Sequence, residues 1–315
     1  MTEVNLSLSE QIEAAAAQLN QLKTNMSQIL KGQEAAIEMT LICFLAGGHL
    51  LIEDVPGVGK TTLASAFAQS LDLPNRRIQF TSDILPTDIL GVNIYDPRES
   101  CFKFHEGPIF TNILLADEIN RAEPRAQSAL LEAMFERQVT LDGVTRALPR
   151  PFMVIATQNP VDFSGTFPLP DSQLDRFQFR ISMGYPAPDA EKALLQHPVL
   201  SPHLSPVLNS DALPQLFELV DRIHVSDEVI EALLALIHAT RNDARLVQGA
   251  STRAMLDLRR AACARALLHR RAFVLPDDLL QLASPTLAHR VRLAPKSSCD
   301  EIDVIEDIAQ RRLTV

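Results

Sequence analysis

The sequence lacks any pair of cysteines spaced to hold a metal or a redox centre. Its four cysteines lie far apart along the chain, at Cys43, Cys101, Cys263 and Cys299. Disulfide scaffolds and zinc sites use cysteines at close and regular spacings. We therefore expect reduced and mostly buried thiols, as in a cytoplasmic protein.

Basic residues are also in short supply. The 315 residues include 29 Lys and Arg against 39 Asp and Glu, and the formal net charge is −10. A protein that binds nucleic acid over a broad surface carries a basic face. The composition argues against such a surface, although it leaves room for a local basic patch.

Long apolar runs are absent as well. The most apolar run, Leu41–Ile52, has about 12 residues and contains His49, whereas a membrane-spanning helix needs about 20. The N-terminus carries Glu3 and Glu10 and has no basic segment followed by an apolar one. We expect no signal peptide, no membrane insertion and a cytoplasmic location. With 46% hydrophobic residues, the chain is long enough for two domains.

The most informative stretch is residues 49–68, HLLIEDVPGVGKTTLASAFA. A short apolar run, Leu50–Ile52, is typical of a buried parallel strand, and a helix-forming run follows Lys60. The loop between them contains two glycines, whose backbone can approach phosphate oxygens at the start of a helix. Strand, glycine-bearing loop, Lys-Thr pair and helix together predict a P-loop.

Within this loop, the expected nucleotide-binding residues are Pro56, Gly57, Val58, Gly59, Lys60, Thr61 and Thr62. Lys60 would lie against the β- and γ-phosphates of ATP, and the Thr61 hydroxyl would bind Mg²⁺. The first position of the usual Gly-x-x-x-x-Gly-Lys-Thr pattern is Asp54. That position begins the loop and is not part of the phosphate cradle, so ATP binding is still expected.

The rest of the chain divides into an alternating part and a helical part. Further strands are expected at Arg77–Phe80, Asn112–Asp117, Phe152–Thr157 and Phe177–Met183. Because these strands are apolar throughout and alternate with helices, they predict a parallel sheet covered on both faces. After Met183 no strand is expected, and helices are predicted at Val225–Thr240, Ser251–His269 and Pro276–Ala283.

Two hairpins are expected within the first part. Val92–Tyr95 and Cys101–His105 alternate around a turn-rich segment. In Val139–Thr145, an Asp-Gly pair lies between β-branched runs, which favours a tight type I′ turn.

A break in the helical pattern precedes the P-loop. Ser7–Leu30 and Gln33–Leu45 both have helical periodicity, and Gly32 separates them. The break could place backbone near an adenine base, and an ordinary turn between two helices explains it equally well. Gly32 is therefore a candidate nucleotide contact.

Paired carboxylates follow one of the predicted strands. Asp117 and Glu118 come directly after Ile113-Leu114-Leu115-Ala116. Ligands collect at the carboxyl edge of an open parallel sheet. There Asp117 would hold Mg²⁺, and Glu118 would orient and deprotonate the attacking water. The competing interpretation is a pair of acidic caps on the next helix.

Three more polar residues are candidates for the same reaction. Asn159 ends another predicted strand, where its side chain could reach the γ-phosphate or the attacking water. Arg176 follows Asp175 in LDRF, and either a surface ion pair or an arginine finger explains it. Arg253 lies in the first turn of a predicted helix, where a cation opposes the helix dipole, so a role outside that helix is favoured.

This order of motifs resembles an AAA+ ATPase, and the match extends further. LIEDVPGVGKT, ADEINRAEPRAQSALLEAMFERQVTLDG, ATQNP, LPDSQLDRF and GASTRA resemble the MoxR family of AAA+ proteins, from about Gly32 to Arg292. The resemblance implies an α/β P-loop NTPase with a parallel five-stranded sheet, followed by a smaller all-α lid. The expected parts are residues 1–184, with hairpins at about 92–105 and 139–145, and a lid at residues 185–315.

The resemblance also assigns roles. It implies Walker A at Asp54–Thr61, Walker B at Asp117-Glu118 and sensor 1 at Asn159. Arg176 would be an arginine finger that acts on the neighbour's ATP, and Arg253 would be sensor 2, acting from the lid of the same subunit.

Partners follow from the resemblance alone. MoxR proteins resemble chaperones that assemble as rings, typically hexamers, and often work with a separate protein bearing a von Willebrand A domain. The function expected is an ATPase with Mg²⁺ that remodels or activates a protein partner. Alternatives are a chelatase-like subunit for metal insertion, a nucleotide-gated scaffold with little turnover, and a DNA motor, which the acidic balance disfavours.

Overall fold

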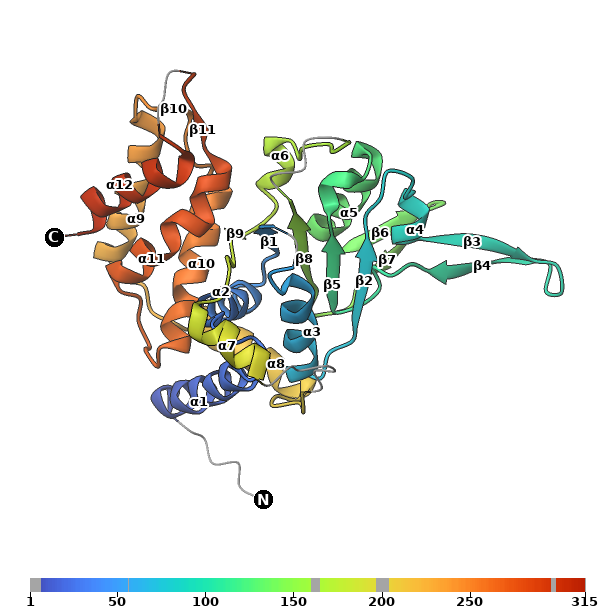
Figure 1. Cartoon of the computed structure of the whole chain (residues 1–315), viewed down its shortest axis with the longest axis horizontal. Coiled ribbons are helices and arrows are strands. Elements are labelled where there is room, and N and C mark those ends of the chain that lie inside the picture. The colour runs from blue at the N-terminus through green and yellow to red at the C-terminus, as the bar shows by residue number, and fades with distance from the viewer. Residues whose placement is uncertain (1–6, 56, 160–164, 197–203, 296–298, 315) are drawn as a thin grey trace.

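The computed structural model describes residues 7–55, 57–159, 165–196, 204–295 and 299–314. Its central sheet has five parallel strands in the order β2-β5-β8-β1-β9 (Figure 1). The strands are β1 (Leu50–Glu53), β2 (Asn75–Gln79), β5 (Ile113–Asp117), β8 (Met153–Gln158) and β9 (Phe179–Ile181). The predicted fold class, an α/β parallel sheet followed by helices, is confirmed.

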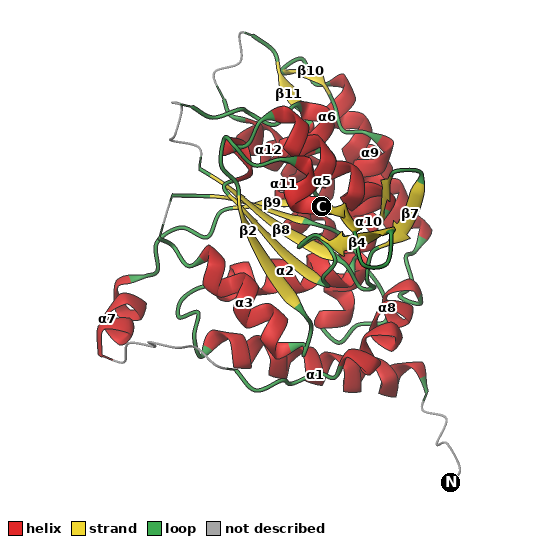
Figure 2. Cartoon of the chain, turned by 90° about the vertical axis from the view of Figure 1, so that its right-hand side faces the viewer, coloured by secondary structure: helices red, strands yellow, loops and turns green. Residues whose placement is uncertain are grey.

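Helices cover both faces of this sheet. On one side lie α1 (Leu8–Ser27), α2 (Glu34–Leu45) and α3 (Lys60–Ser70), and on the other lies α5 (Pro124–Glu136) (Figure 2). The short helix α4 (Pro86–Leu90) packs into the same core as α5. Neighbouring strand residues point to opposite faces, so Leu50 and Ile52 join one core and Leu51 joins the other. Because both faces are buried, β1, β5 and β8 are mostly apolar, whereas β2 at the edge of the sheet has four exposed residues out of five.

Two antiparallel hairpins extend from this layer. The first is formed by β3 (Gly91–Asp96) and β4 (Cys101–Glu106), and projects away from the body (Figure 1). The second, β6 (Gln138–Leu141) with β7 (Val144–Ala147), turns through Asp142 and Gly143 at φ 50° and 76°. Positive φ at both turn residues is the type I′ geometry that the Asp-Gly pair predicts.

The remainder of the described chain is mainly helical. Its helices are α6 (Asp171–Leu174), α7 (Pro188–Gln196), α8 (Leu213–Asp221), α9 (Asp227–Asn242), α10 (Thr252–Leu268), α11 (Pro276–Leu287) and α12 (Glu301–Leu313). The expectation of no strand after Met183 is wrong, because β10 (Leu246–Gln248) pairs with β11 (Arg292–Leu293). Strands of two or three residues are too short to show a period of two in the sequence.

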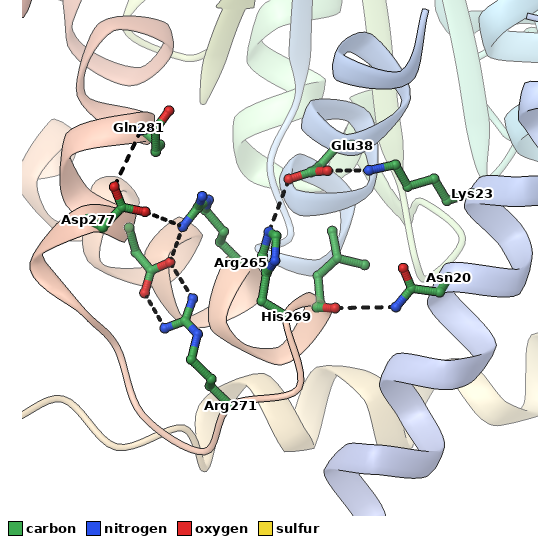
Figure 3. Close-up of polar contacts among 10 residues, drawn as sticks. Asn20, Lys23, Glu38, Arg265, His269, Arg271, Asp277 and Gln281 are labelled. Carbon is green, nitrogen blue, oxygen red and sulfur yellow. Dashed lines mark hydrogen bonds and ion pairs between the residues drawn. The ribbon is translucent and has the colours of Figure 1, made fainter.

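The N-terminal helices pack against the C-terminal helices through a shared hydrophobic core. One hydrophobic cluster contains Leu19 of α1, Ile37 of α2 and Leu258 of α10. At its edge, Glu38 accepts hydrogen bonds from Lys23 and, at 3.2 Å, from His269 Nε2 (Figure 3). The predicted boundary near residue 184 stays a proposal, since a common core extends across it.

Asp278 on α11 is a buried charge that holds this helical part together. Its carboxylate accepts hydrogen bonds from Arg271 at 2.6 and 2.7 Å and from Arg265 (Figure 3 labels both arginines). It also accepts the Leu275 N–H at 2.8 Å. Burial acts to raise the pKa of Asp278, but the bonds from Arg271, Leu275 and Arg265 outweigh it and lower the pKa below its ordinary value. The carboxylate therefore stays ionised in the folded protein.

We expect Asp278→Ala to lower the free energy of unfolding by about 3–5 kcal/mol, because two arginines lose a buried partner. Urea denaturation measures this loss, and Asp277→Ala is the matched control, since Asp277 is exposed and 3.3 Å from Arg265. The control should cost less than about 1 kcal/mol. The Asp278 contribution is present above pH 3.8, its ordinary pKa, and is lost as the pH falls through the lower folded value. Equal losses for both variants would contradict the buried-pair explanation.

Within the described ranges, no helix is both long and apolar enough to cross a membrane.

Candidate nucleotide site

The loop between β1 and α3 has the backbone that a P-loop needs. Gly57 and Gly59 lie at φ 89° and 100°, a left-handed region that glycine adopts without strain. Gly59 caps α3, and Lys60 is the first residue of that helix. Pro56, which the sequence analysis placed in this loop, lies outside the described residues.

A cavity of about 360 Å³ lies over this loop at the carboxyl edge of the sheet. Asp117 ends β5 and Asn159 directly follows β8, so both reach the cavity from strand ends. The lining residues are Gly57, Gly59, Lys60, Thr61, Thr62, Arg77, Asp117, Glu118 and Asn159. The structure thus brings together the predicted loop residues other than Pro56 and Val58, both carboxylates and Asn159. Val58, which was also predicted to contact the nucleotide, is buried and does not line this cavity.

A hydrogen bond holds the Lys60 side chain in place, but among the described residues Lys60 forms no ion pair with a carboxylate. Its Nζ donates to the backbone oxygen of Asp54 at 2.6 Å. Burial lowers the pKa of Lys60 below its ordinary value, while the charges of Asp54, Asp117 and Glu118 act to raise it. A bound phosphate would give the Lys60 ammonium an anionic partner.

Asp117 is fixed from both sides. Its Oδ1 accepts a hydrogen bond from the Thr157 hydroxyl at 2.6 Å, and its Oδ2 pairs with Arg77 at 2.6 Å. Thr157 in turn accepts the backbone N–H of Glu118 at 2.9 Å. One buried hydroxyl on β8 therefore positions both residues of the acidic pair.

Glu118 has an unusual backbone. It lies at φ 56° and ψ 48°, the left-handed region that costs a residue with a side chain roughly 1–2 kcal/mol. Its Oε2 accepts from Gln79 at 2.7 Å and pairs with Arg121 at 3.1 Å. The Glu118 carboxylate lines the cavity. Glu118 stands at the N-cap position of the short helix Ile119–Arg121, but its side chain makes no capping bond, which does not support the competing interpretation of a helix cap.

The residues at hand suit a magnesium ion bound together with a nucleotide. The described part of the chain contains no cluster of three or more His, Cys, Asp or Glu that would hold a metal alone. Mg²⁺ in nucleotide sites takes one or two protein oxygens and fills its remaining positions with water and phosphate oxygens. Thr61 and Asp117, both in the cavity, provide that limited set.

Gly32 lies beside the P-loop but does not line the cavity. A Cβ at Gly59 would lie 3.8 Å from Leu30 Cδ2, so the turn between α1 and α2 borders the loop. Gly32 itself has φ +73°, and a Cβ there would meet Ala190 Cβ at 2.9 Å. Close packing and backbone conformation therefore require glycine. Its predicted contact with the base stays a proposal.

Sequence reasoning missed Arg77, Gln79 and Thr157. Arg77 and Gln79 lie on β2. They contact Asp117, which ends the neighbouring strand β5, and Glu118, which follows it. Nothing in their local sequence indicates this, because the pairing of β2 with β5 depends on strand order. β2 itself is mostly polar, with Ile78 as its one buried residue, so its own pattern does not single out Arg77 or Gln79.

Arg176 and Arg253 lie together at a second cavity, separate from the P-loop cavity. Both line a cavity of about 960 Å³ that also includes His49 and Phe152, which directly precede β1 and β8. That is the amino edge of the sheet, opposite the P-loop cavity. The two guanidinium groups lie 5.6 and 4.4 Å from the centroid of the Phe135 ring. The expectation that Arg253 acts on the nucleotide of its own subunit is not supported, because α10 begins at this opposite edge.

The ion-pair interpretation of Arg176 is not supported either. Its Nη1 donates to the Leu131 carbonyl at 2.5 Å, and among the described residues it has no carboxylate partner. Arg253 does pair with Asp175, at 3.7 Å. An arginine without a counter-charge beside an open cavity is available for an anion from outside the subunit.

A parallel sheet with a P-loop, an acidic pair at the carboxyl end of another strand and a helical lid together define an AAA+ ATPase. A family model described as "ATPase family associated with various cellular activities (AAA)" matches residues 49–179, and one described as "AAA lid domain" matches residues 238–309. A crystal structure of a presumed ATPase from Cytophaga hutchinsonii has a TM-score of 0.89 at 34% identity and covers 96% of both chains.

Curated relatives narrow the class to one family. The protein YeaC of Bacillus subtilis is 44% identical over 88% of both chains. Chaperone MoxR1 of Mycobacterium tuberculosis is 39% identical over 92% of this chain and 80% of its own length. The chain belongs to the MoxR family of AAA+ ATPases.

Proposed function

We propose that this protein hydrolyses ATP with Mg²⁺ as a ring, typically a hexamer, and uses the energy to remodel or activate a protein partner. The observation that carries this proposal is the separation of Arg176 and Arg253 from the P-loop cavity of their own subunit. Two arginines at the opposite edge of the sheet can complete a nucleotide site only on a neighbouring copy. We therefore assign both to the neighbour's ATP.

The proposed chemistry uses the residues around the P-loop. The loop N–H groups and Lys60 bind the phosphates, and Thr61 and Asp117 hold Mg²⁺. When bound, Mg²⁺ would neutralise charge that develops on the phosphates. Glu118 takes a proton from the attacking water, and Asn159 orients that water or the γ-phosphate. Gln79 and Arg121 hold the Glu118 carboxylate until then.

The proposed protein partner rests on similarity to relatives. One relative is named as a chaperone, and a similar role is proposed here. A separate protein with a von Willebrand A domain is the partner that the family resemblance implies. The β3–β4 hairpin, which projects from the body, is the proposed contact (Figure 1). A cytoplasmic location stays a prediction.

The test is ATP turnover per subunit, measured over a wide range of protein concentration. Turnover should rise with concentration and then level off as rings form, because each site needs an arginine from a neighbour. Lys60→Ala should abolish both nucleotide binding and turnover, and Lys103→Ala, which removes an exposed hairpin lysine, is the matched control. Turnover that does not change on dilution would contradict a site shared between subunits.

A further inference from the structure

Asp54, the departure from the P-loop pattern, has a side chain with an extensive set of partners. Its Oδ2 accepts hydrogen bonds from the Ser182 hydroxyl at 2.9 Å and from the N–H groups of Met183 and Gly184, both at 2.7 Å. Its Oδ1 accepts the N–H of Val55 at 2.8 Å. One carboxylate thus joins the start of the P-loop to the three residues that follow β9.

The partners of this carboxylate are all neutral donors. Asp54 is only 7% exposed, and Lys60 contacts its backbone oxygen, not its side chain. Burial acts to raise the pKa of Asp54, yet the bonds from Gly184, Ser182, Val55 and Met183 lower it below its ordinary value. A buried anion with four donors is a fixed structural element, which a glycine at this position cannot provide.

The segment that Asp54 holds continues to the turn between α1 and α2. The Gly184 carbonyl accepts a hydrogen bond from Gln33 Nε2 at 3.2 Å. A Cβ at Gly59 would lie 3.8 Å from Leu30 and 3.9 Å from Met183. Residues 182–184 and the 30–33 turn therefore form a wall along one side of the P-loop, and we call it the loop wall.

Asp54 is also linked to the phosphate end of the site. Its backbone oxygen accepts the Lys60 ammonium at 2.6 Å, and this group must turn to the phosphates when ATP binds. The Asp54 side chain thus contacts the loop wall, and its backbone oxygen contacts the phosphate-binding lysine.

We propose that Asp54 is a positioning residue that holds the loop wall against the nucleoside part of a bound nucleotide. This inference rests on the proposed function, since it requires ATP in the P-loop. Lys60 and the loop N–H groups bind the triphosphate, and the wall held by Asp54 adds the part of the affinity that comes from base and ribose. A non-glycine residue at the first position of the loop then has a function of its own.

The test compares two probes, ATP and inorganic tripolyphosphate, on Asp54→Gly. The variant should bind ATP about tenfold more weakly, because several charge-assisted hydrogen bonds to the wall are lost. Its affinity for tripolyphosphate should change by less than about twofold, because the cradle does not need the wall. Hydrogen exchange at the Met183 and Gly184 amides should speed up in the absence of any ligand.

Graded variants separate positioning from simple loss of structure. Asp54→Asn keeps one oxygen for the three donors of the wall and should restore most of the ATP affinity, while Ser182→Ala removes a single donor and should have a small effect. Asp300→Gly is the matched control, because Asp300 also accepts a backbone N–H, at 2.7 Å, but caps the distant helix α12. It should leave both affinities unchanged.

Equal weakening of ATP and tripolyphosphate binding would overturn the proposal, because Asp54 would then support only the phosphate loop. Unchanged binding of both would overturn it as well. Wild-type protein that binds neither probe would overturn the proposed function itself, and this inference with it.

Discussion

Replacing Arg176 with alanine is expected to lower ATP turnover by roughly 10³- to 10⁵-fold, the range for arginine fingers. ATP binding by each subunit should be unchanged, because Arg176 lines the cavity at the amino edge of the sheet and not the P-loop cavity. The side chain is already positioned by its bond to the Leu131 carbonyl and has no ion pair among the described residues. Its loss therefore removes charge from the transition state and little from the fold.

A mixing experiment measures whether Arg176 acts between subunits. Arg176→Ala keeps an intact P-loop, and Lys60→Ala keeps an intact arginine, so mixed rings contain complete sites where the two variants are neighbours in the right order. Each variant alone should be inactive, and the mixture should recover part of the wild-type turnover. Arg312→Ala, at an exposed position on α12, is the control for loss of one positive charge. No recovery in the mixture would contradict a role on the neighbour's nucleotide.

Glu118→Gln is expected to lower turnover by roughly 10²- to 10⁴-fold, because the amide cannot take a proton from water. Binding of ATP and Mg²⁺ should be kept, since Asp117 and its bonds to Thr157 and Arg77 are untouched. The variant should therefore hold ATP for long periods. We expect it to accumulate in rings.

Light scattering with and without ATP and Mg²⁺ measures this accumulation. The mass should rise from 34.8 kDa for one chain to that of a ring when both are present. Lys60→Ala, which cannot bind ATP, should stay at the lower mass. A single-chain mass for Glu118→Gln under both conditions would contradict nucleotide-driven assembly and would remove the basis for Arg176 acting between subunits.

Much of the fold was predictable from local patterns. The strands that end at Asp117 and Gln158 begin with buried apolar residues, as expected in a parallel sheet covered on both faces. Their carboxyl ends must lie at one edge of the sheet, so Asp117, Glu118 and Asn159 were predicted to meet the P-loop. The Asp142-Gly143 turn followed from backbone preference alone.

Other features depend on contacts between distant parts of the chain. The place of Arg253 depends on how α10 packs against α1 and α2, and no periodicity within residues 252–268 contains that information. Arg77 and Gln79 reach the acidic pair only because β2 lies beside β5. The bonds of Asp54 connect residues 128 to 130 positions apart in sequence, which a pattern read along the chain cannot detect.

The left-handed backbone of Glu118 has a consequence for how the protein can change over generations. A residue without a side chain at this position would relieve the local strain, and the folded state would gain stability while the proposed general base disappeared. Selection for abundance in the cell and selection for turnover therefore act in opposite directions on one codon. A population that only needed the folded ring, and not its chemistry, would be expected to lose this glutamate early.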